Sequence, residues 1–355
     1  MKALIFDPYF DTLGGGERYC LTVAECLLKN NWQADLWWDQ SSDIEKAKER
    51  FGLKTDKLGI VGKKMEEFSF FEKLFLMRKY DLVFWLSDGS VPTMTGKINL
   101  LHLQAPLVGF NPKRLKDKFK KLLISDVICN SKFTKTYIDK DYGYNSLVLY
   151  PPIDVDQFAP GEKENIIIAV GRFEQTAQMQ TKRQDVLLKA FKKMVDKGLS
   201  GWRLVLIGGS LGDPSKNKNL ISLRKASRGY PVEFVVDGPF SVLKDYYSKA
   251  KIFWHAAGYG IDEDKEPWKV EHFGITPVEA MAAGCVPVVI DKGGLKEIVR
   301  RGIGYRWGTV EELIEITGRL IANQSETKKL SLMAIKTSKE FSKSKFNKQF
   351  LEIIK

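Results

Sequence analysis

Short apolar runs alternate with longer amphipathic stretches along most of the 355-residue chain. Apolar runs bounded by turn residues are typical of buried parallel strands, and the stretches between them have helical spacing. In the first part of the chain the pattern predicts strands at Ala3–Phe6, Ala34–Trp38, Asp81–Leu86, Ile98–Leu103, Val127–Cys129 and Ser146–Tyr150. Helices are expected between them, for example at Glu17–Lys29 and Phe68–Lys79. Strands that alternate with helices indicate an α/β unit with a parallel, doubly wound sheet.

The same alternation begins again after Pro151-Pro152 and a polar, turn-rich segment. The later strands are predicted at Ile166–Val170, Arg203–Ile207, Val232–Val236, Ile252–Trp254 and Val286–Ile290. The helices among them are predicted at Asp185–Lys197, Leu243–Lys249, Pro277–Ala283 and Leu295–Arg300. A chain of this length exceeds the size of one growing core, so we expect two Rossmann-like domains.

Three segments follow from this pattern: an N-terminal domain at 1–158, a C-terminal domain at 159–335, and a terminal helix at 336–355 that packs back on the N-terminal domain. Ligands of doubly wound sheets bind beyond the carboxyl ends of the strands. The expected fold is therefore α/β, with two Rossmann-like domains facing a deep cleft that holds the ligand.

Composition narrows the class of protein. The net charge of +12 favours an anionic partner, which could be a nucleic acid, an anionic lipid or a phosphorylated substrate. The cysteines show no CxxC pairing, which indicates reduced thiols in a cytosolic protein: Cys20, Cys26, Cys129 and Cys285. The first residues, MKALIFD, are too short for a signal peptide, and no apolar run approaches the roughly 20 residues of a spanning helix. We expect a cytoplasmic protein or one that binds the cytosolic face of a membrane.

A glycine-rich turn, Gly14-Gly15-Gly16-Glu17, separates the first predicted strand from the first helix. Glycines let a backbone approach a phosphate at a helix N-terminus. Tyr19 occupies the position of the last glycine in the dinucleotide fingerprint, so that motif is absent. The alternative to a phosphate-binding loop is a tight turn with no ligand.

After the glycine-rich turn, the second candidate ligand-binding segment is the run VEHFGITPVEAMAAG at residues 270–284. Thr276 followed by Pro277, with Glu279 three residues after Thr276, predicts an N-cap, a first helical residue and a capping box. Glu271 precedes this helix start, so two carboxylates flank a candidate anion site, and a carboxylate can accept two hydroxyl hydrogen bonds from a ribose or a sugar. Otherwise, Glu279 caps a helix and Glu271 is a solvated charge.

A third candidate is Gly171-Arg172 after the first strand of the second domain, followed by Lys182. Two fixed cations at the end of a strand suit the diphosphate of a leaving group. In a chain this basic, such a pair by itself is weak evidence.

Several motifs together resemble family 4 glycosyltransferases, in order and over nearly the whole chain: GGGER, HLQAP, NSKFTKTYI, PPIDVDQF, VGRF with KRQDVLLKAF, and EHFGITPVEAMAAGCVPVVIDKGGLKEIV. The last motif carries the family's pair of glutamates eight positions apart, here Glu271 and Glu279. The residues of this motif are most similar to those of mannosyltransferases that extend lipid-linked oligosaccharides. The resemblance implies the two-domain GT-B fold, with the acceptor on the first domain and the nucleotide sugar on the second.

The resemblance also implies roles for individual residues. Gly15 and Gly16 match the loop against the donor diphosphate, and Arg172 and Lys182 match the cation pair on it. His102, in HLQAP, matches a histidine near the reacting sugar, although a single histidine at a strand end is more often structural. The donor nucleotide and the transferred sugar would be held by Glu271, Phe273, Gly274, Ile275, Thr276 and Glu279. Within this set Glu279 matches the ribose ligand, and Glu271 with the 273–276 backbone matches the group that orients the sugar.

One departure from the family concerns the cation pair. Lys182 follows Arg172 by ten residues, whereas the family interval is about five. We interpret the difference as an inserted loop, with Arg183 as an alternative to Lys182.

The function expected from the resemblance is retaining transfer of a hexose, best assigned as mannose from GDP-mannose, to a lipid-linked or glycan acceptor. The acceptor hydroxyl attacks on the face from which the diphosphate departs. No Asp-x-Asp motif is present, so we expect no metal and no cofactor. The alternatives are an epimerase or hydrolase of nucleotide sugars with the same fold, a phosphorylase, and a transferase that uses a UDP-sugar. No nucleic-acid motif accompanies the positive charge, so nucleic acid is not an expected partner.

A basic amphipathic stretch, FNPKRLKDKFKKLLI at residues 110–124, suits an anionic membrane surface. Its apolar positions Leu115, Phe119, Leu122 and Leu123 fall at helical spacing opposite many of the lysines. An aromatic-rich stretch at residues 68–77 accompanies it. The alternative is a helix that faces the core, with solvated lysines.

Overall fold

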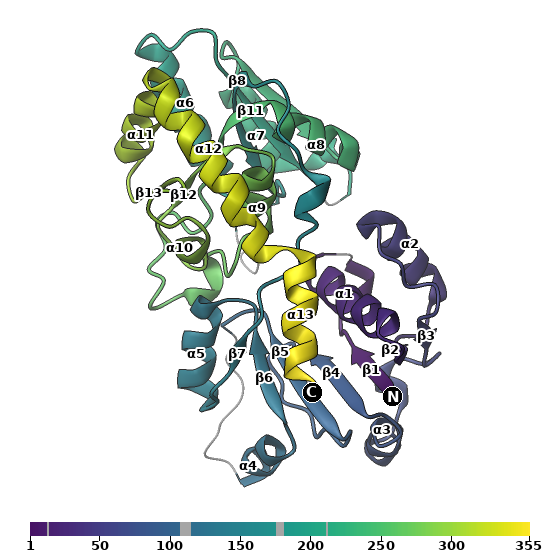
Figure 1. The fold of residues 1–355 in the computed structure, drawn as a ribbon. Coiled ribbons are helices and arrows are strands. Elements are labelled where there is room, and N and C mark those ends of the chain that lie inside the picture. The colour runs from purple at the N-terminus through teal and green to yellow at the C-terminus, as the bar shows by residue number, and fades with distance from the viewer. Residues whose placement is uncertain (13, 107–114, 175–180, 211) are drawn as a thin grey trace. The chain divides into compact units, whose positions relative to one another are not determined.

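The computed structural model describes residues 1–12, 14–106, 115–174, 181–210 and 212–355. The chain divides into two compact units, the first formed by residues 1–152 and 343–355 and the second by residues 153–342 (Figure 1). Each unit is an α/β layer structure built on a parallel sheet.

In the first unit, the described residues form a seven-stranded sheet in the order β3-β2-β1-β4-β5-β6-β7. The strands are β1 Lys2–Phe6, β2 Gln33–Trp37, β3 Gly59–Ile60, β4 Leu82–Leu86, β5 Ile98–Leu103, β6 Asp126–Cys129 and β7 Leu147–Val148. The helices are α1 Gly15–Lys29, α2 Ser41–Phe51, α3 Phe70–Met77, α4 Leu115–Leu122, α5 Lys132–Tyr142 and α13 Lys343–Ile353, with 3-10 turns η1 Phe10–Thr12 and η2 Met65–Glu67. The strand order reverses between β1 and β4, which is where doubly wound sheets bind ligands.

Two apolar clusters cover the faces of this sheet. One joins the sheet to α1, α2 and α13, and the other joins it to α3, α5 and the loop between β4 and β5. The chain end lies in the first cluster: Phe346 and Phe350 are buried, and the Phe346 ring packs edge-on against Tyr19 with centroids 4.9 Å apart. Lys343 at the start of α13 pairs with Glu25 of α1 at 2.5 Å.

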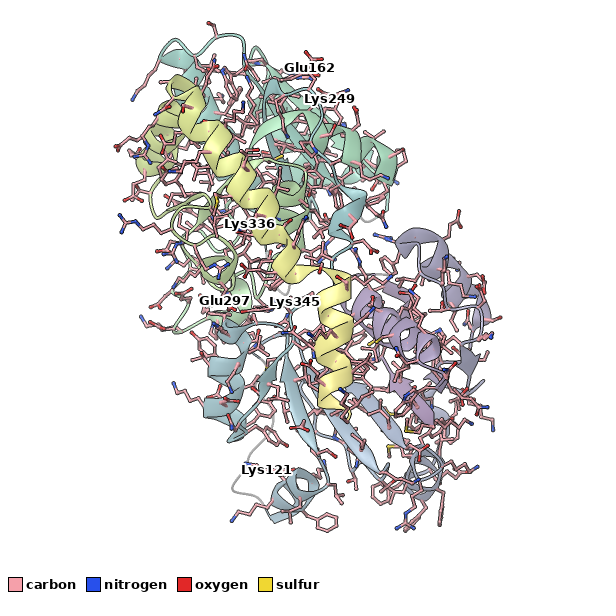
Figure 2. All side chains as sticks on the ribbon, viewed as in Figure 1. Lys121, Glu162, Lys249, Glu297, Lys336 and Lys345 are labelled. Atoms are coloured by element: carbon pink, nitrogen blue, oxygen red, sulfur yellow. The ribbon has the colours of Figure 1, made fainter. Side chains whose placement is uncertain are left out.

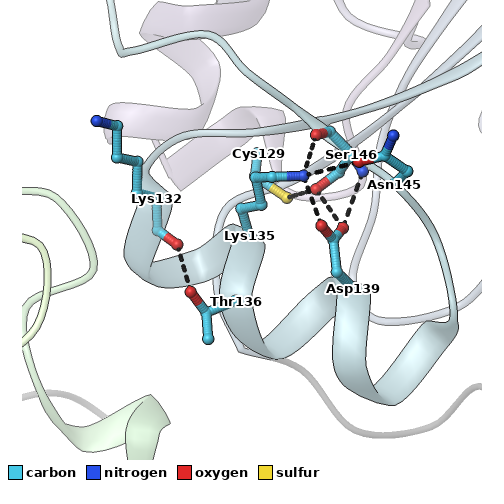
Figure 3. A network of polar contacts seen from close by, with 7 residues as sticks. All are labelled: Cys129, Lys132, Lys135, Thr136, Asp139, Asn145 and Ser146. Atoms are coloured by element: carbon cyan, nitrogen blue, oxygen red, sulfur yellow. Dashed lines mark hydrogen bonds and ion pairs between the residues drawn. The ribbon is translucent and has the colours of Figure 1, made fainter.

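A polar network fixes α5 to the neighbouring strands (Figure 3). Lys135 Nζ lies 2.5 Å from Asp139 Oδ2 and donates to the carbonyl of Ser146 at 2.5 Å. Asp139 Oδ1 accepts from the amide and hydroxyl of Ser146 at 2.8 and 2.7 Å, and the Cys129 thiol donates to the same hydroxyl oxygen at 3.3 Å. These partly buried groups satisfy one another, so the network supports the strand ends of β6 and β7.

The second unit holds, within the described residues, a six-stranded sheet in the order β10-β9-β8-β11-β12-β13. The strands are β8 Glu164–Val170, β9 Arg203–Gly208, β10 Val232–Val236, β11 Ala250–His255, β12 Val286–Ile290 and β13 Tyr305–Trp307. The helices are α6 Gln184–Asp196, α7 Lys218–Ala226, α8 Phe240–Lys249, α9 Ile275–Ala282, α10 Leu295–Ile298, α11 Val310–Ala322 and α12 Gln324–Ser338. Short 3-10 turns complete the unit: η3 Val155–Gln157, η4 Pro214–Lys216, η5 Pro267–Lys269 and η6 Lys339–Phe341.

The unit boundaries differ from the expected boundaries at 158/159 and 335/336. The chain passes into the second unit after Pro152 and leaves it after Ser342. Two contacts explain the difference. The turn η3 packs against α9, and the amide of Ile153 donates to the carbonyl of Phe341 at 3.1 Å, so residues 153–158 and 336–342 belong to the second unit.

No helix in the described residues has the length and apolar character that a membrane span requires. The described part of the chain also holds no group of three His, Cys, Asp or Glu side chains placed to bind a metal ion.

Candidate functional site

The glycine-rich turn lies at the carboxyl end of β1, where the strand order of the first sheet reverses. Helix α1 begins at Gly15 with Gly14 as its N-cap, and the Glu17 carboxylate accepts from the Gly14 amide and from the Thr12 hydroxyl, the latter at 2.9 Å. A Cβ at Gly16 would lie 3.1 Å from Leu86 Cδ2, so this position sits close to the end of β4. The turn therefore presents the positive end of a 15-residue helix at the sheet's switch point.

A buried carboxyl beneath this turn was not identified from the sequence. Asp7 follows β1 and is fully buried, and its Oδ1 accepts from the Tyr9 amide at 3.0 Å. Burial and the nearby charge of Glu17 raise the pKa of Asp7 to about 7. Burial also raises the pKa of Glu17. Near neutral pH the pair carries less than its full negative charge, which reduces the repulsion of an anion bound at the turn.

His102 lies on β5 and is fully buried. Its Nδ1 is 3.1 Å from the carbonyl oxygen of Ile128, and its Nε2 is 3.0 Å from Nε2 of Gln104. The ring stacks on Tyr19 with centroids 4.0 Å apart, and burial lowers the pKa of His102 to about 3. The imidazole is thus neutral with both nitrogens engaged. In this structure Gln104, which is partly exposed, is the residue of this pair that can meet a ligand.

In the second unit the cation pair lies at the carboxyl end of β8. Arg172 is exposed and makes no ion pair with any residue that the structure describes. Gln184 fixes the local backbone by donating to the carbonyls of Gly171 and Arg172 at 3.1 and 2.9 Å. Residues 175–180 of the inserted loop lie outside the described residues. The Lys182 side chain packs against Gly171, next to Arg172 in the chain, because a Cβ at Gly171 would lie 2.6 Å from Lys182 Cγ.

Lys182 and Glu271, 89 positions apart, form an ion pair with Nζ 2.5 Å from Oε2. Both side chains are largely buried. Burial raises the pKa of Glu271, but the charge of Lys182 and the contact with His255 outweigh that effect and hold it well below its usual range. Glu271 is therefore an ionised carboxylate, and the solvated-charge alternative for it is wrong.

Arg183 has a different set of contacts. Its Nε and Nη2 pair with both oxygens of Asp185 at 3.0 Å, and its Nη1 donates to the carbonyl of Tyr259 at 2.7 Å. The guanidinium also lies over the Tyr259 ring. Because these contacts occupy Arg183, the geometry favours Lys182 as the partner of Arg172.

The helix after Glu271 starts two residues earlier than the sequence predicts, at Ile275 and not at Pro277. Helix α9 begins at Ile275, its N-cap is Gly274 with φ of 106°, and no side chain caps it. The predicted capping box of Thr276 and Glu279 is therefore wrong. Pro277 is still compatible with its position in the first turn of α9, because the amides of that turn have no intrahelical partner for proline to remove.

Glu279 lies in the second turn of α9 and is buried. The Tyr247 hydroxyl lies 3.4 Å from its Oε2 and 3.3 Å from the carbonyl oxygen of Thr276. Phe273 is also buried, with its ring 5.5 Å from that of Phe341, so only its backbone is available to a ligand. A carboxylate and the amides of a helix start thus occur together at α9.

Two further features of the second unit were missed by the sequence analysis. His255, the last residue of β11, places Nε2 3.4 Å from Oε2 of Glu271. Gly293 and Gly294 pack on the backbone beside Glu271: the Gly294 amide donates to the Glu271 carbonyl at 2.8 Å, and a Cβ at Gly294 would lie 2.1 Å from the carbonyl oxygen of His272. A histidine at a strand end and a double glycine after β12 are the signals that could have identified them.

Solved structures with similar folds define the fold class. An Anabaena protein, Alr3699/HepE, crystallised with UDP, has a TM-score of 0.73 and 18% identity over 99% of both chains. A glycosyltransferase from Rickettsia africae has a TM-score of 0.76 and 16% identity, with 99% of this chain and 97% of that chain covered. These similarities, with the two Rossmann-like sheets, show the GT-B fold.

The family follows from the sequence. The model of the family Glycosyl transferases group 1 matches residues 152–337, just over half of the chain, and the chain belongs to this family. The matched region contains the cation pair, Glu271, and helix α9.

Curated relatives carry one recurring name, "GDP-Man:Man(3)GlcNAc(2)-PP-Dol alpha-1,2-mannosyltransferase". The protein from Dictyostelium discoideum is 28% identical over 248 residues, which are 67% of this chain and 47% of that protein. The human protein is 30% identical over 251 residues, 64% of this chain and 47% of that protein. The chain spans about half the length of these relatives.

Proposed function

We propose that the protein is a retaining glycosyltransferase that moves mannose from GDP-mannose to a hydroxyl of a lipid-linked or glycan acceptor. The observation that carries the proposal is the cluster in the second unit, where Arg172 follows β8, the Lys182–Glu271 pair lies beside Gly171, and Glu279 lies in α9. The choice of mannose and GDP rests on the names of the relatives.

Each charged side chain of the candidate site would bind one part of the donor in this reaction. Departure of GDP leaves negative charge on its terminal phosphate, which Arg172 and Lys182 would stabilise. Glu271 would accept a hydrogen bond from a hydroxyl of the mannose, and Glu279 would accept two from the ribose. In the first unit, Gly15 and Gly16 would place backbone amides against the diphosphate. No cofactor and no metal is required in this scheme, because the cation pair supplies the charge.

The bonds that change are the sugar C1–phosphate oxygen bond, which breaks, and the C1–acceptor oxygen bond, which forms on the same face. The acceptor's proton passes to the departing phosphate oxygen. No side chain acts as a nucleophile, so the rate enhancement comes from positioning and charge stabilisation.

A panel of nucleotide sugars tests the donor, because a ligand that binds only the native state raises the melting temperature. GDP-mannose is expected to raise Tm more than UDP-glucose or UDP-N-acetylglucosamine, with or without EDTA. A larger effect of a UDP-sugar would contradict the assignment to GDP, and loss of the effect in EDTA would contradict the metal-free clamp. Rapid hydrolysis of the donor without acceptor would favour the epimerase or hydrolase alternative.

The membrane partner is proposed from α4. Residues 110–114 of the basic stretch lie outside the described residues, as do the side chains of Leu115 and Lys116. In the rest of the helix Phe119 and Leu122 are 59% and 83% exposed. Lys120 donates to the carbonyl of Val91 at 2.7 Å, and Lys121, labelled in Figure 2, lies over the Tyr144 ring. The helix thus turns these two apolar side chains to solvent, the opposite of the core-facing alternative.

Helix α3, in the same unit, also exposes apolar side chains. Phe70, Phe71 and Phe75 are exposed on α3, while its Met77 joins the apolar cluster that Ile124, just after α4, also contacts. The apolar surface of α4 is formed by Phe119 and Leu122, and Phe70, Phe71 and Phe75 are further apolar side chains that this unit exposes. Exposed Lys118 gives the apolar surface of α4 a positive charge that complements anionic lipid headgroups. We therefore propose that it binds the cytosolic face of an anionic membrane.

Substituting Phe119→Asp together with Leu122→Asp is expected to abolish sedimentation of the protein with phosphatidylserine vesicles. Both side chains are exposed, so folding and the thermal shift with GDP-mannose should be retained. The matched control is Leu332→Asp on α12, a residue 61% exposed on the second unit, which should sediment like the wild type. Sedimentation of the double variant at the wild-type level would contradict the membrane assignment.

A further inference from the structure

One oxygen of Glu271 is shared by two basic side chains of the second unit. Its Oε2 lies 2.5 Å from Lys182 Nζ and 3.4 Å from His255 Nε2. The first distance is that of a strong charge-assisted hydrogen bond, and the second is longer than a well-formed one. In this structure, Lys182 therefore dominates the position of the carboxylate.

The imidazole of His255 has no other partner among the described residues. It is almost completely buried, and neither of its ring nitrogens makes a hydrogen bond that meets normal geometry with any described group. A buried polar group without a partner is costly and is usually retained for a reason. The contact with Glu271 is the one polar interaction within reach.

The backbone at His255 is held firmly. It is the last residue of β11, a central strand that pairs with β8 and β12. The preceding Trp254 is fully buried and donates its indole N–H to the Thr317 hydroxyl at 3.1 Å. The imidazole is therefore carried by a rigid element, whereas the Lys182 ammonium ends a flexible chain.

The charge state of the imidazole suits a hydrogen-bond donor and not a phosphate ligand. Burial lowers the pKa of His255, and although Glu271 raises it and Lys182 lowers it further, the net direction is downward. The ring is neutral at neutral pH and can donate one N–H while leaving the phosphate charge to Arg172 and Lys182.

We propose that His255 is a positioning residue that takes over the Glu271 carboxylate when Lys182 turns to the donor diphosphate. The inference rests on the proposed function, in which the diphosphate takes Lys182 and Glu271 orients the transferred sugar. Once Lys182 leaves, the 3.4 Å gap closes to a normal Nε2–H···Oε2 hydrogen bond. The carboxylate then remains ionised and fixed, with its other oxygen free for the sugar hydroxyl.

Two amide substitutions separate this role from a packing role. In His255→Gln the side-chain nitrogen falls near the position of Nε2, so the donation to Glu271 is retained. In His255→Asn the nitrogen falls near the position of Nδ1 and cannot reach the carboxylate. Both variants are polar and smaller than or similar to histidine, so a general disturbance of the core would affect both.

The measurements are calorimetric titrations with GDP and with GDP-mannose, and turnover at saturating GDP-mannose. For His255→Asn we expect GDP affinity within about twofold of the wild type, but GDP-mannose affinity and kcat lower by about tenfold or more, because only the sugar uses Glu271. His255→Gln should stay within about threefold of the wild type in all three. Equal behaviour of the two variants, or equal losses for GDP and GDP-mannose, would overturn the proposal.

A double-mutant cycle gives a second, independent test. In a Glu271→Gln background the substitution His255→Asn should cost little further turnover, because the carboxylate it positions is gone. Additive losses would assign His255 to packing alone. A wild-type protein that binds neither GDP nor GDP-mannose would instead contradict the proposed function itself, so the two failures are distinguishable.

Discussion

Replacing Arg172 by Ala is expected to lower turnover at saturating GDP-mannose by about 10²-fold or more. Removing one preorganised group that stabilises developing charge typically costs about 3 kcal/mol of the activation free energy. The guanidinium is exposed at the end of β8 and pairs with no described residue, so Tm should not change. Steady-state turnover and a thermal melt of the same preparation test whether activity falls while Tm is unchanged. The matched control is Arg228→Ala, an exposed arginine after α7, which should retain full activity.

The partner of Arg172 is tested in the same assay. Lys182→Ala should lower turnover by a similar factor. It should also lower Tm, because Glu271 then loses the cation of a largely buried ion pair and keeps only the hydrogen bond from the neutral His255 imidazole. The loss should be smaller than the roughly 3–5 kcal/mol typical of a buried charge left with no partner. Arg183→Ala is expected to affect Tm through its loss of Asp185 and Tyr259, with turnover at saturating donor near normal. Normal turnover of the Arg172 or Lys182 variant, or a large loss of turnover in Arg183→Ala alone, would contradict the clamp.

Replacing Glu279 by Gln is expected to weaken GDP binding by about 1.5–3 kcal/mol, the scale of hydrogen bonds to a charged group. That is roughly ten- to a hundredfold in Kd. A ribose diol needs two acceptors, and Gln replaces one acceptor by a donor. Thermal stability should change little, because Gln can still accept from the Tyr247 hydroxyl through its carbonyl oxygen.

The competing role for Glu279 is that of a core carboxylate held by Tyr247. Under that alternative, calorimetry would give equal GDP affinities for Glu279→Gln and the wild type. Tyr247→Phe is the informative comparison, because it removes only the hydroxyl that Glu279 and the Thr276 carbonyl share. If Glu279 is the ribose ligand, Tyr247→Phe should lower Tm and reduce GDP affinity less than Glu279→Gln does.

The alternation of apolar and polar residues was sufficient to predict both sheets. Each predicted strand overlaps an observed one, because buried parallel strands are continuous apolar runs. The pattern missed β3 and β13, edge strands of two and three residues that owe their pairing to neighbouring strands. It also misplaced the start of α9, since Thr-Pro fits the first turn as well as the cap, and only the positive φ of Gly274 decides between them.

The candidate site, like the fold, was predicted from the sequence only in part. Motif spacing identified Glu271 and Lys182 but could not show that they touch across 89 positions. His255 and Asp7 carry no local pattern, and their importance comes only from what tertiary folding places beside them. The lysines and apolar residues of α4 are compatible with either orientation of the helix, so the exposure of Phe119 was not predictable from periodicity.

The central claim is tested most directly by incubating the purified chain with GDP-mannose and a lipid-linked oligosaccharide acceptor, and determining the anomeric configuration of the new linkage by NMR. GDP-mannose carries an α-linked sugar, so retention predicts an α-mannosyl product, formed in the presence of EDTA and at a rate that Arg172→Ala reduces about 10²-fold. A β-linked product, transfer from a UDP-sugar in preference to GDP-mannose, or hydrolysis of GDP-mannose without transfer to the acceptor would contradict the account.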